Sequence, residues 1–148
     1  MPVWIWFFLA ILAGAFIPVQ TGMNVRLSQA WQHPLLASLA VFLIGAATMA
    51  LAAFASRRPL PDLPTFAAAS PVDLFGGVLA AAYIVALLTV APKLGAAPTV
   101  AGVIVGQLVC SVVLDHFGLL GFPEHSLGWQ RAAGLCLLVA GAYLVRRF

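Results

Sequence analysis

Apolar residues fill five stretches of bilayer length along this chain, and short polar or proline-containing segments separate them. A helix needs about 20 apolar residues to cross the hydrocarbon core, because it rises ~1.5 Å per residue. The pattern therefore predicts an all-α membrane protein with five transmembrane helices. We expect these spans at about residues 3–28, 35–55, 72–91, 98–117 and 127–145. Residues 1–148 are expected to form a single integral membrane domain.

The segment between the second and third spans is rich in proline. It begins after Arg57 and Arg58 and contains Pro59, Pro61, Pro64 and Pro71. Proline removes a backbone donor and breaks helices. The spacing predicts the longest loop of the protein here, without a regular helix.

Three polar residues interrupt the fourth apolar stretch, namely Gln107, Ser111 and Asp115. They lie four residues apart, and residues at this spacing share one face of a helix. The amide, the hydroxyl and the carboxylate therefore form one polar stripe. We expect this edge of the helix to avoid lipid.

A second polar pair, Gln20 and Asn24, occurs near the end of the first span at the same four-residue spacing. One interpretation is that the helix ends here and its polar residues emerge into water. The other is that the helix continues to about Ser28 and directs both amides into an internal cavity. In that second case Gln20, Asn24, Gln107 and Ser111 are the expected substrate-binding residues.

Glycines at regular spacing predict surfaces where helices pack closely. Gly102 and Gly106 form a small-xxx-small pair in the fourth span, and Gly134 and Gly141 lie seven residues apart in the fifth. Such glycines let two membrane helices approach each other.

Asp115 has two interpretations with opposite consequences. As a carboxylate near the edge of a span, it could be the residue that couples transport to protons or selects the charge of the solute. It could instead form a structural ion pair with Arg131 or Arg26. The sequence leaves both open.

The composition excludes several classes of protein. Hydrophobic residues make up 64% and charged residues 7% of the chain, against roughly 25% charged in a soluble domain. The net charge of +3 comes from Lys and Arg at the ends of spans, which argues against a nucleic-acid site. Cys110 and Cys136 fall inside spans and act as small apolar residues.

Enzymatic chemistry has no support in the pattern of reactive residues. The sequence shows no nucleophile with its base, no metal-ligand cluster and no cofactor motif. The three histidines, His33, His116 and His125, fall in links or at span ends, as surface imidazoles commonly do. We expect no enzyme activity, no metal and no cofactor.

Lys and Arg are divided almost evenly between the two sides that five spans define. One side carries Arg26, Lys93, Arg146 and Arg147, and the other carries Arg57, Arg58 and Arg131. Excess positive charge normally fixes the cytoplasmic side. The even division predicts either insertion in both orientations or a topology set by a partner or by loop lengths. Two oppositely inserted copies would form a ten-helix, antiparallel inverted-repeat dimer, an architecture of secondary transporters.

Several segments resemble one known family. They are QTGMNVRLSQ, GGVLAAAY, LGAAPTVAGVIVGQLVCSVVLDHFGLLGFP and RAAGLCLLVAGAYLV, and the most specific residues are Gly106, Gln107, Asp115, Phe117 and Gly118. Together they look like the small five-helix YdcZ-type family of the drug/metabolite transporter superfamily. The resemblance covers nearly the whole chain.

This resemblance implies half of a transporter in the bacterial inner membrane, paired as a homodimer or as a heterodimer with a similar five-helix protein. Related small multidrug-resistance proteins carry a glutamate in their first helix for proton-coupled exchange. This chain has Gln20 and Asn24 in that region, so the resemblance does not carry that mechanism over. The expected partners are the lipid bilayer, a second five-helix chain and a small-molecule solute. A small-ion channel and a non-transporting accessory protein are the alternatives.

Overall fold

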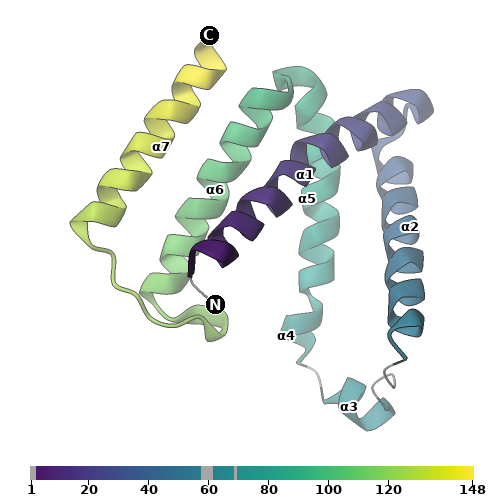
Figure 1. The fold of residues 1–148 in the computed structure, drawn as a ribbon. Coiled ribbons are helices and arrows are strands. Elements are labelled where there is room, and N and C mark those ends of the chain that lie inside the picture. The colour runs from purple at the N-terminus through teal and green to yellow at the C-terminus, as the bar shows by residue number, and fades with distance from the viewer. Residues whose placement is uncertain (1–2, 58–61, 69) are drawn as a thin grey trace. The chain divides into compact units, whose positions relative to one another are not determined.

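The computed structural model describes residues 3–57, 62–68 and 70–148, and the described part is helical without strands. Its elements are α1 (Val3–Trp31), α2 (Pro34–Ala55), α3 (Leu63–Ala67), α4 (Pro71–Leu74), α5 (Gly76–Leu94), α6 (Ala96–His116), the 3-10 turn η1 (Leu119–Gly121) and α7 (Trp129–Arg147), as Figure 1 shows. The predicted all-α class is therefore confirmed.

Four helical segments of the described chain are long and apolar enough to cross a membrane. They are Val3–Trp31, Pro34–Ala55, Pro71–Leu94 and Ala96–His116. The fifth long helix, α7, has an apolar middle, but Gln130, Arg131, Arg146 and Arg147 make its two ends polar. Its role as a fifth span stays a prediction.

The surface of these helices is apolar, and the interior is small. Phe54 is 84% exposed and Trp4 is 77% exposed, whereas the buried hydrophobic residues of the described chain are Ala37, Leu87, Leu88 and Ala91. Such a surface would be unstable in water. In a bilayer it is the surface that contacts lipid tails.

The chain divides into two compact units, Met1–Lys93 and Leu94–Phe148. In the first unit α1 packs on α2, and in the second α6 packs on α7. The expectation of a single membrane domain stays a prediction. The division falls next to Gly95, whose φ of +87° and ψ of 167° suit only glycine. A residue with a Cβ would be strained in this junction.

The first span is longer than expected, because α1 continues through Pro18 to Trp31. The interpretation in which the helix ends near Gln20 is therefore wrong. The chain reverses at Gln32 and His33, and the His33 Nδ1 atom accepts a hydrogen bond from the Leu36 N–H at 3.4 Å. Pro34 occupies the first position of α2, where its missing N–H has no intrahelical partner to lose.

The other span boundaries also shift by a few residues. The third span begins as α4 at Pro71, breaks around Phe75 and continues as α5 through Pro92 to Leu94. The fourth begins at Ala96, two residues earlier than predicted. The last begins at Trp129 and ends at Arg147, two residues later than predicted at each end.

The predicted loop contains one short helix, which corrects the expectation that no helix forms there. Asp62 stands before α3, and its Oδ1 atom accepts a hydrogen bond from the Thr65 N–H at 3.1 Å. Hydrogen bonds from Thr65 lower the pKa of the Asp62 carboxyl below its ordinary value of 3.8. Pro64 is tolerated because it lies in the first turn. Arg58, Pro59 and Pro61 lie outside the described residues.

Candidate functional site

A buried polar cluster lies on the last turns of α1 and the first turns of α2. Thr21, Asn24 and Ser28 are each less than 9% exposed and share one face of α1 at i, i+3 and i+7. On α2, Ser38 is 4% exposed and its neighbour Ala37 is fully buried. We define the buried polar cluster as Thr21, Asn24, Ser28 and Ser38.

Two hydroxyls of the cluster are satisfied by their own helices. Thr21 donates to the Ile17 carbonyl at 2.7 Å, and Ser38 donates to the Pro34 carbonyl at 2.8 Å. Hydroxyls that bond back to the preceding turn need no partner from a neighbouring helix. These residues can therefore face an apolar interior at little cost.

Asn24 differs from them because it keeps an unpaired donor. Its side chain is 8% exposed, and its Nδ2 atom has no hydrogen-bond partner in the described part of the chain. A buried donor without a partner costs about 1–3 kcal/mol. The group is therefore available to bond a ligand, a water molecule or another chain.

The two amides predicted to bind substrate in the first span differ in burial, and their binding role stays a prediction. Asn24 is buried, but Gln20 is exposed. Thr21 and Ser28 take part in its place, and neither was predicted as a site residue. The sequence did contain a signal for them, because Thr21, Asn24 and Ser28 are spaced at i, i+3 and i+7. The prediction instead paired Asn24 with Gln20, which lies four residues before it.

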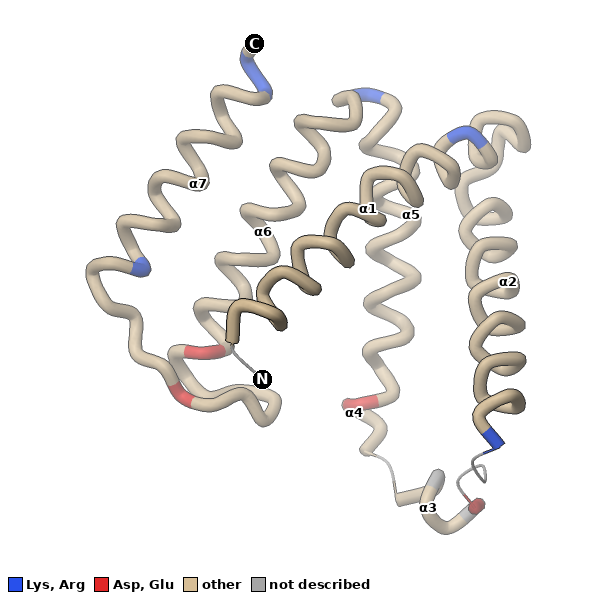
Figure 2. Tube along the Cα trace, viewed as in Figure 1, with Lys and Arg blue, Asp and Glu red and all other residues tan. Residues whose placement is uncertain are grey.

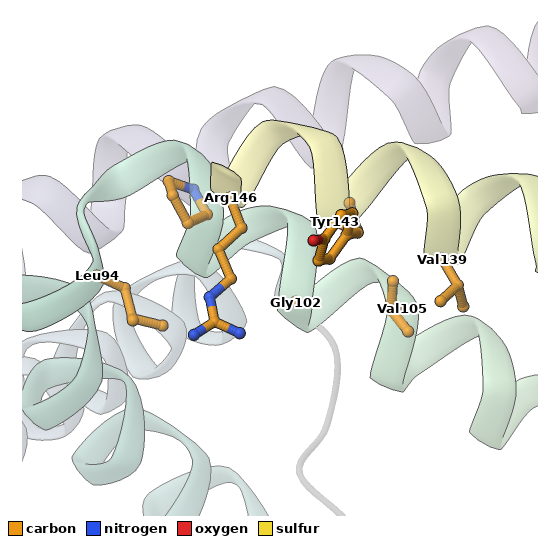
Figure 3. Close-up of a pocket in the computed structure, with 8 residues that line it drawn as sticks. Leu94, Gly102, Val105, Val139, Tyr143 and Arg146 are labelled. Atoms are coloured by element: carbon orange, nitrogen blue, oxygen red, sulfur yellow. The ribbon is translucent and has the colours of Figure 1, made fainter. Parts of the chain in front are cut away.

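The polar stripe of α6 lies in the second unit. Val105 faces α7 across a groove, opposite Val139 (Figure 3). Gln107 is two residues further along, about 200° round the helix, and both Gln107 and Ser111 are exposed. Gln107 and Ser111 therefore point away from α7, whereas Asp115, near the end of α6, contacts Arg131 of α7. A cavity that Gln107 and Ser111 share with Asn24 stays a prediction, because Asn24 belongs to the first unit and the other two residues belong to the second.

The ion pair predicted between Asp115 and Arg131 is present. The Arg131 Nη1 atom lies 3.6 Å from the Asp115 Oδ2 atom, and the side chains are 41% and 34% exposed, respectively. Asp115 is near the end of α6 and Arg131 near the start of α7. In Figure 2 acidic and basic positions lie near the connection between α6 and α7, and further basic positions lie at the other end of α7. The pair is partly solvated, so its contribution is about 0–1 kcal/mol. A coupling role for Asp115 stays a prediction.

Hydrogen bonds from backbone and side-chain groups hold the α6–α7 connection around this ion pair. The His125 N–H donates to the Asp115 carbonyl at 2.7 Å, and Arg131 donates to the His125 carbonyl at 3.3 Å. The Leu127 N–H donates to the His116 Nδ1 atom at 3.1 Å. The connection thus folds back on the end of α6. His116 and His125 have structural roles here that their sequence positions did not reveal.

The predicted packing glycines do not form the α6–α7 contact. A Cβ atom built on Gly102, Gly106, Gly134 or Gly141 meets no atom within 4 Å. On α7 the partly buried residues are Ala132, Leu135, Leu138 and Ala142 instead. The glycines remain candidates for packing against a surface outside this helix pair.

Metal binding finds no support in the described residues, which contain no group of three or more His, Cys, Asp or Glu side chains placed to hold an ion. Cys110 and Cys136 are free thiols on the exposed surface. The candidate site consists of the Asn24 amide and the hydroxyls of the buried polar cluster, groups that can form hydrogen bonds.

Comparison with known proteins adds a family. A family model described as "Putative inner membrane exporter, YdcZ" matches residues 5–144. The chain is also 28% identical over 137 residues to the curated Inner membrane protein YdcZ of Escherichia coli (strain K12). That alignment covers 93% of this chain and 91% of the relative. No solved structure matches.

Proposed function

This chain belongs to the YdcZ family of inner membrane exporters, and from that membership we propose that it is one half of a secondary transporter for a small solute. A transporter-type function follows from the family, whose described activity is export rather than catalysis. We add three points that the family description does not give: transport is coupled, the transporter is a dimer, and the solute is small.

The observation that carries the proposal is the unpaired donor of Asn24. Its Nδ2 atom is buried without a partner inside a helix of bilayer length. Polar groups within membrane spans usually face a bundle interior or a solute path. A hydrogen-bonding solute that binds Asn24 in one state of the transporter would recover the lost bond. Ser28, one turn further on the same face, is placed to join it.

The second half of the transporter is proposed to be another five-helix chain inserted in the opposite direction. In this arrangement α7 serves as the fifth span of each half. The support is the even division of positive charge, with four Lys and Arg residues on one side and three on the other. The exposed Gln107 and Ser111 also support it, since polar groups in hydrocarbon need partners that a second chain could supply.

Transport is tested by comparing cells that express the wild type, Asn24→Leu and a matched control, Gln29→Leu. Gln29 is an exposed amide on the same helix. We expect the wild type and the control to change the same set of small solutes in the growth medium, as measured by untargeted mass spectrometry. Asn24→Leu should abolish that change at equal expression. If the wild type changes no solute relative to cells without the protein, the transporter proposal fails.

Orientation is tested separately with a single cysteine. Phe148 is 96% exposed, so Phe148→Cys can be labelled when Cys110 and Cys136 are replaced by alanine. Antiparallel insertion predicts that a membrane-impermeant maleimide labels about half of the protein in intact spheroplasts and the rest after permeabilisation. Labelling of all or none in intact spheroplasts would exclude the antiparallel homodimer.

A further inference from the structure

An open groove separates α6 and α7 at the end of the pair where α6 begins and α7 ends. Its volume is about 550 Å³. Pro98, Gly102 and Val105 line it from α6, and Val139, Ala142 and Arg146 line it from α7. Figure 3 shows Val105 and Val139 facing each other at one end, and Arg146 at the other.

The groove is lined mainly by apolar residues, and the residues near its middle have small side chains or none. Gly102 has no side chain, and a Cβ built there meets no atom within 4 Å. Ala142 adds only a methyl group from α7. From Arg146 to Val139 the helix spans seven residues, about 10 Å of rise. The groove therefore extends from the end of α7 toward its middle.

The end of the groove is positively charged. Arg146 makes no hydrogen bond or ion pair within the described part of the chain, and Arg147 donates to the Tyr143 hydroxyl at 3.1 Å. The ion pair of this unit, Asp115–Arg131, lies at the opposite end of the helices, because Asp115 is near the end of α6 and Arg131 near the start of α7. Tyr143, Arg146 and Arg147 also line a smaller hollow of about 280 Å³ beside the groove. These two guanidinium groups thus share one hollow without a carboxylate.

Charge complementarity and shape together identify the occupant. An apolar groove that ends at Arg146, with Arg147 in the adjoining hollow, fits a molecule with an acyl chain and an anionic head, and arginine binds phosphate through paired N–H donors. We propose that the groove binds an anionic phospholipid of the surrounding membrane. Its phosphate contacts Arg146 and Arg147, and one acyl chain lies between Gly102 and Val139. This site is independent of the proposed transport function.

The experiment measures lipid affinity with the full-length protein, purified in a nonionic detergent and freed of lipid. Phosphatidylglycerol and phosphatidylcholine with identical acyl chains are titrated, and bound lipid is counted by native mass spectrometry. Each arginine near a lipid surface contributes about fivefold to affinity, so two predict a preference of about 25-fold for phosphatidylglycerol. Arg146→Gln should reduce this preference about fivefold. Arg57→Gln, an equal charge change in the other unit, should leave it intact.

The acyl-chain contact is tested by filling the groove. Gly102→Leu should weaken the binding of both lipids severalfold, because the new side chain occupies the space proposed for the acyl chain. Gly134→Leu is the matched control, since Gly134 lies on α7 outside the groove lining. If Gly102→Leu does not fold, Ala142→Leu makes the same test from the other wall.

Three results would overturn the proposal. The first is equal affinity for the two lipids. The second is an equal loss of the preference for phosphatidylglycerol in Arg57→Gln and Arg146→Gln, which would indicate unspecific charge attraction. The third is binding of glycerol 1-phosphate as tight as that of phosphatidylglycerol. That outcome would mean that the arginines hold a free phosphate and that the groove is not used.

Discussion

Replacing Asn24 by leucine should leave the folded protein as stable as the wild type or make it more stable. The structural reason is the Nδ2 atom, which is buried and unpaired in a side chain only 8% exposed. Its NH₂ group carries two donors. Leucine has a similar volume and no polar atom, so the variant removes the unsatisfied group without opening a cavity.

The magnitude follows from two opposing terms. Removing the unpaired donor raises the free energy of unfolding by about 1–3 kcal/mol. The change of side-chain shape in a packed contact costs up to about 1.5 kcal/mol. The expected free energy of unfolding therefore lies between about 0.5 kcal/mol below and about 3 kcal/mol above that of the wild type. A typical substitution at a buried position instead destabilises by about 1 kcal/mol.

The assay is reversible unfolding in mixed micelles with increasing denaturing detergent, followed by circular dichroism. Asn24→Ala removes the same donor but leaves a cavity, so it should be less stable than Asn24→Leu. Gln20→Leu is the control at an exposed amide and should change stability by less than about 0.5 kcal/mol. If Asn24→Leu destabilises by more than about 1 kcal/mol relative to that control, the amide is bonded in the folded protein and the reasoning is refuted.

Three further outcomes are expected. A double-mutant cycle with Asp115→Asn and Arg131→Gln should give a coupling energy of about 0.2–1 kcal/mol that decreases with added salt, since the pair is partly exposed; a coupling above about 3 kcal/mol would mean that the pair is desolvated in the membrane. Gly106→Leu should leave the α6–α7 contact intact and reduce cross-linking between two chains, and unchanged cross-linking would exclude it from the interface. The lowered pKa of Asp62 stabilises α3 above the unfolded pKa, and this stabilisation is lost as the pH falls through the folded value, so the protection factor of the Thr65 amide, measured against its intrinsic exchange rate at each pH, should fall in acid for the wild type but not for Asp62→Asn.

The sequence by itself predicted the helical class and located four of the spans to within a few residues at most boundaries. Bilayer-length apolar runs are a local signal, because a spanning segment must satisfy its backbone hydrogen bonds within itself. The same locality explains the errors. The predicted first and third spans end too early, and the helices continue to Trp31 and, through Pro92, to Leu94, because a proline removes only one donor. Asp62 and its bond to Thr65 allowed a short helix in a segment whose prolines suggested none.

Only the tertiary structure decided which face of each helix is buried. In a soluble protein, apolar residues mark the inner face, but these helices are apolar on every side, so the periodicity carries little information. Thr21 and Ser28 are buried while Gln20 is exposed, although Gln20 has the same four-residue spacing from Asn24 that suggested a shared face.

Contacts between residues far apart in the sequence were also decided by the tertiary structure. The sequence left Arg26 and Arg131 as alternative partners of Asp115, and the connection that folds back through His125 brings Arg131 to it. The groove that ends at Arg146 arises because Gly102 faces α7 where Ala142 is also small. A regular glycine spacing can identify small residues but cannot show which helix they face, since that depends on how two rods of apolar side chains pack.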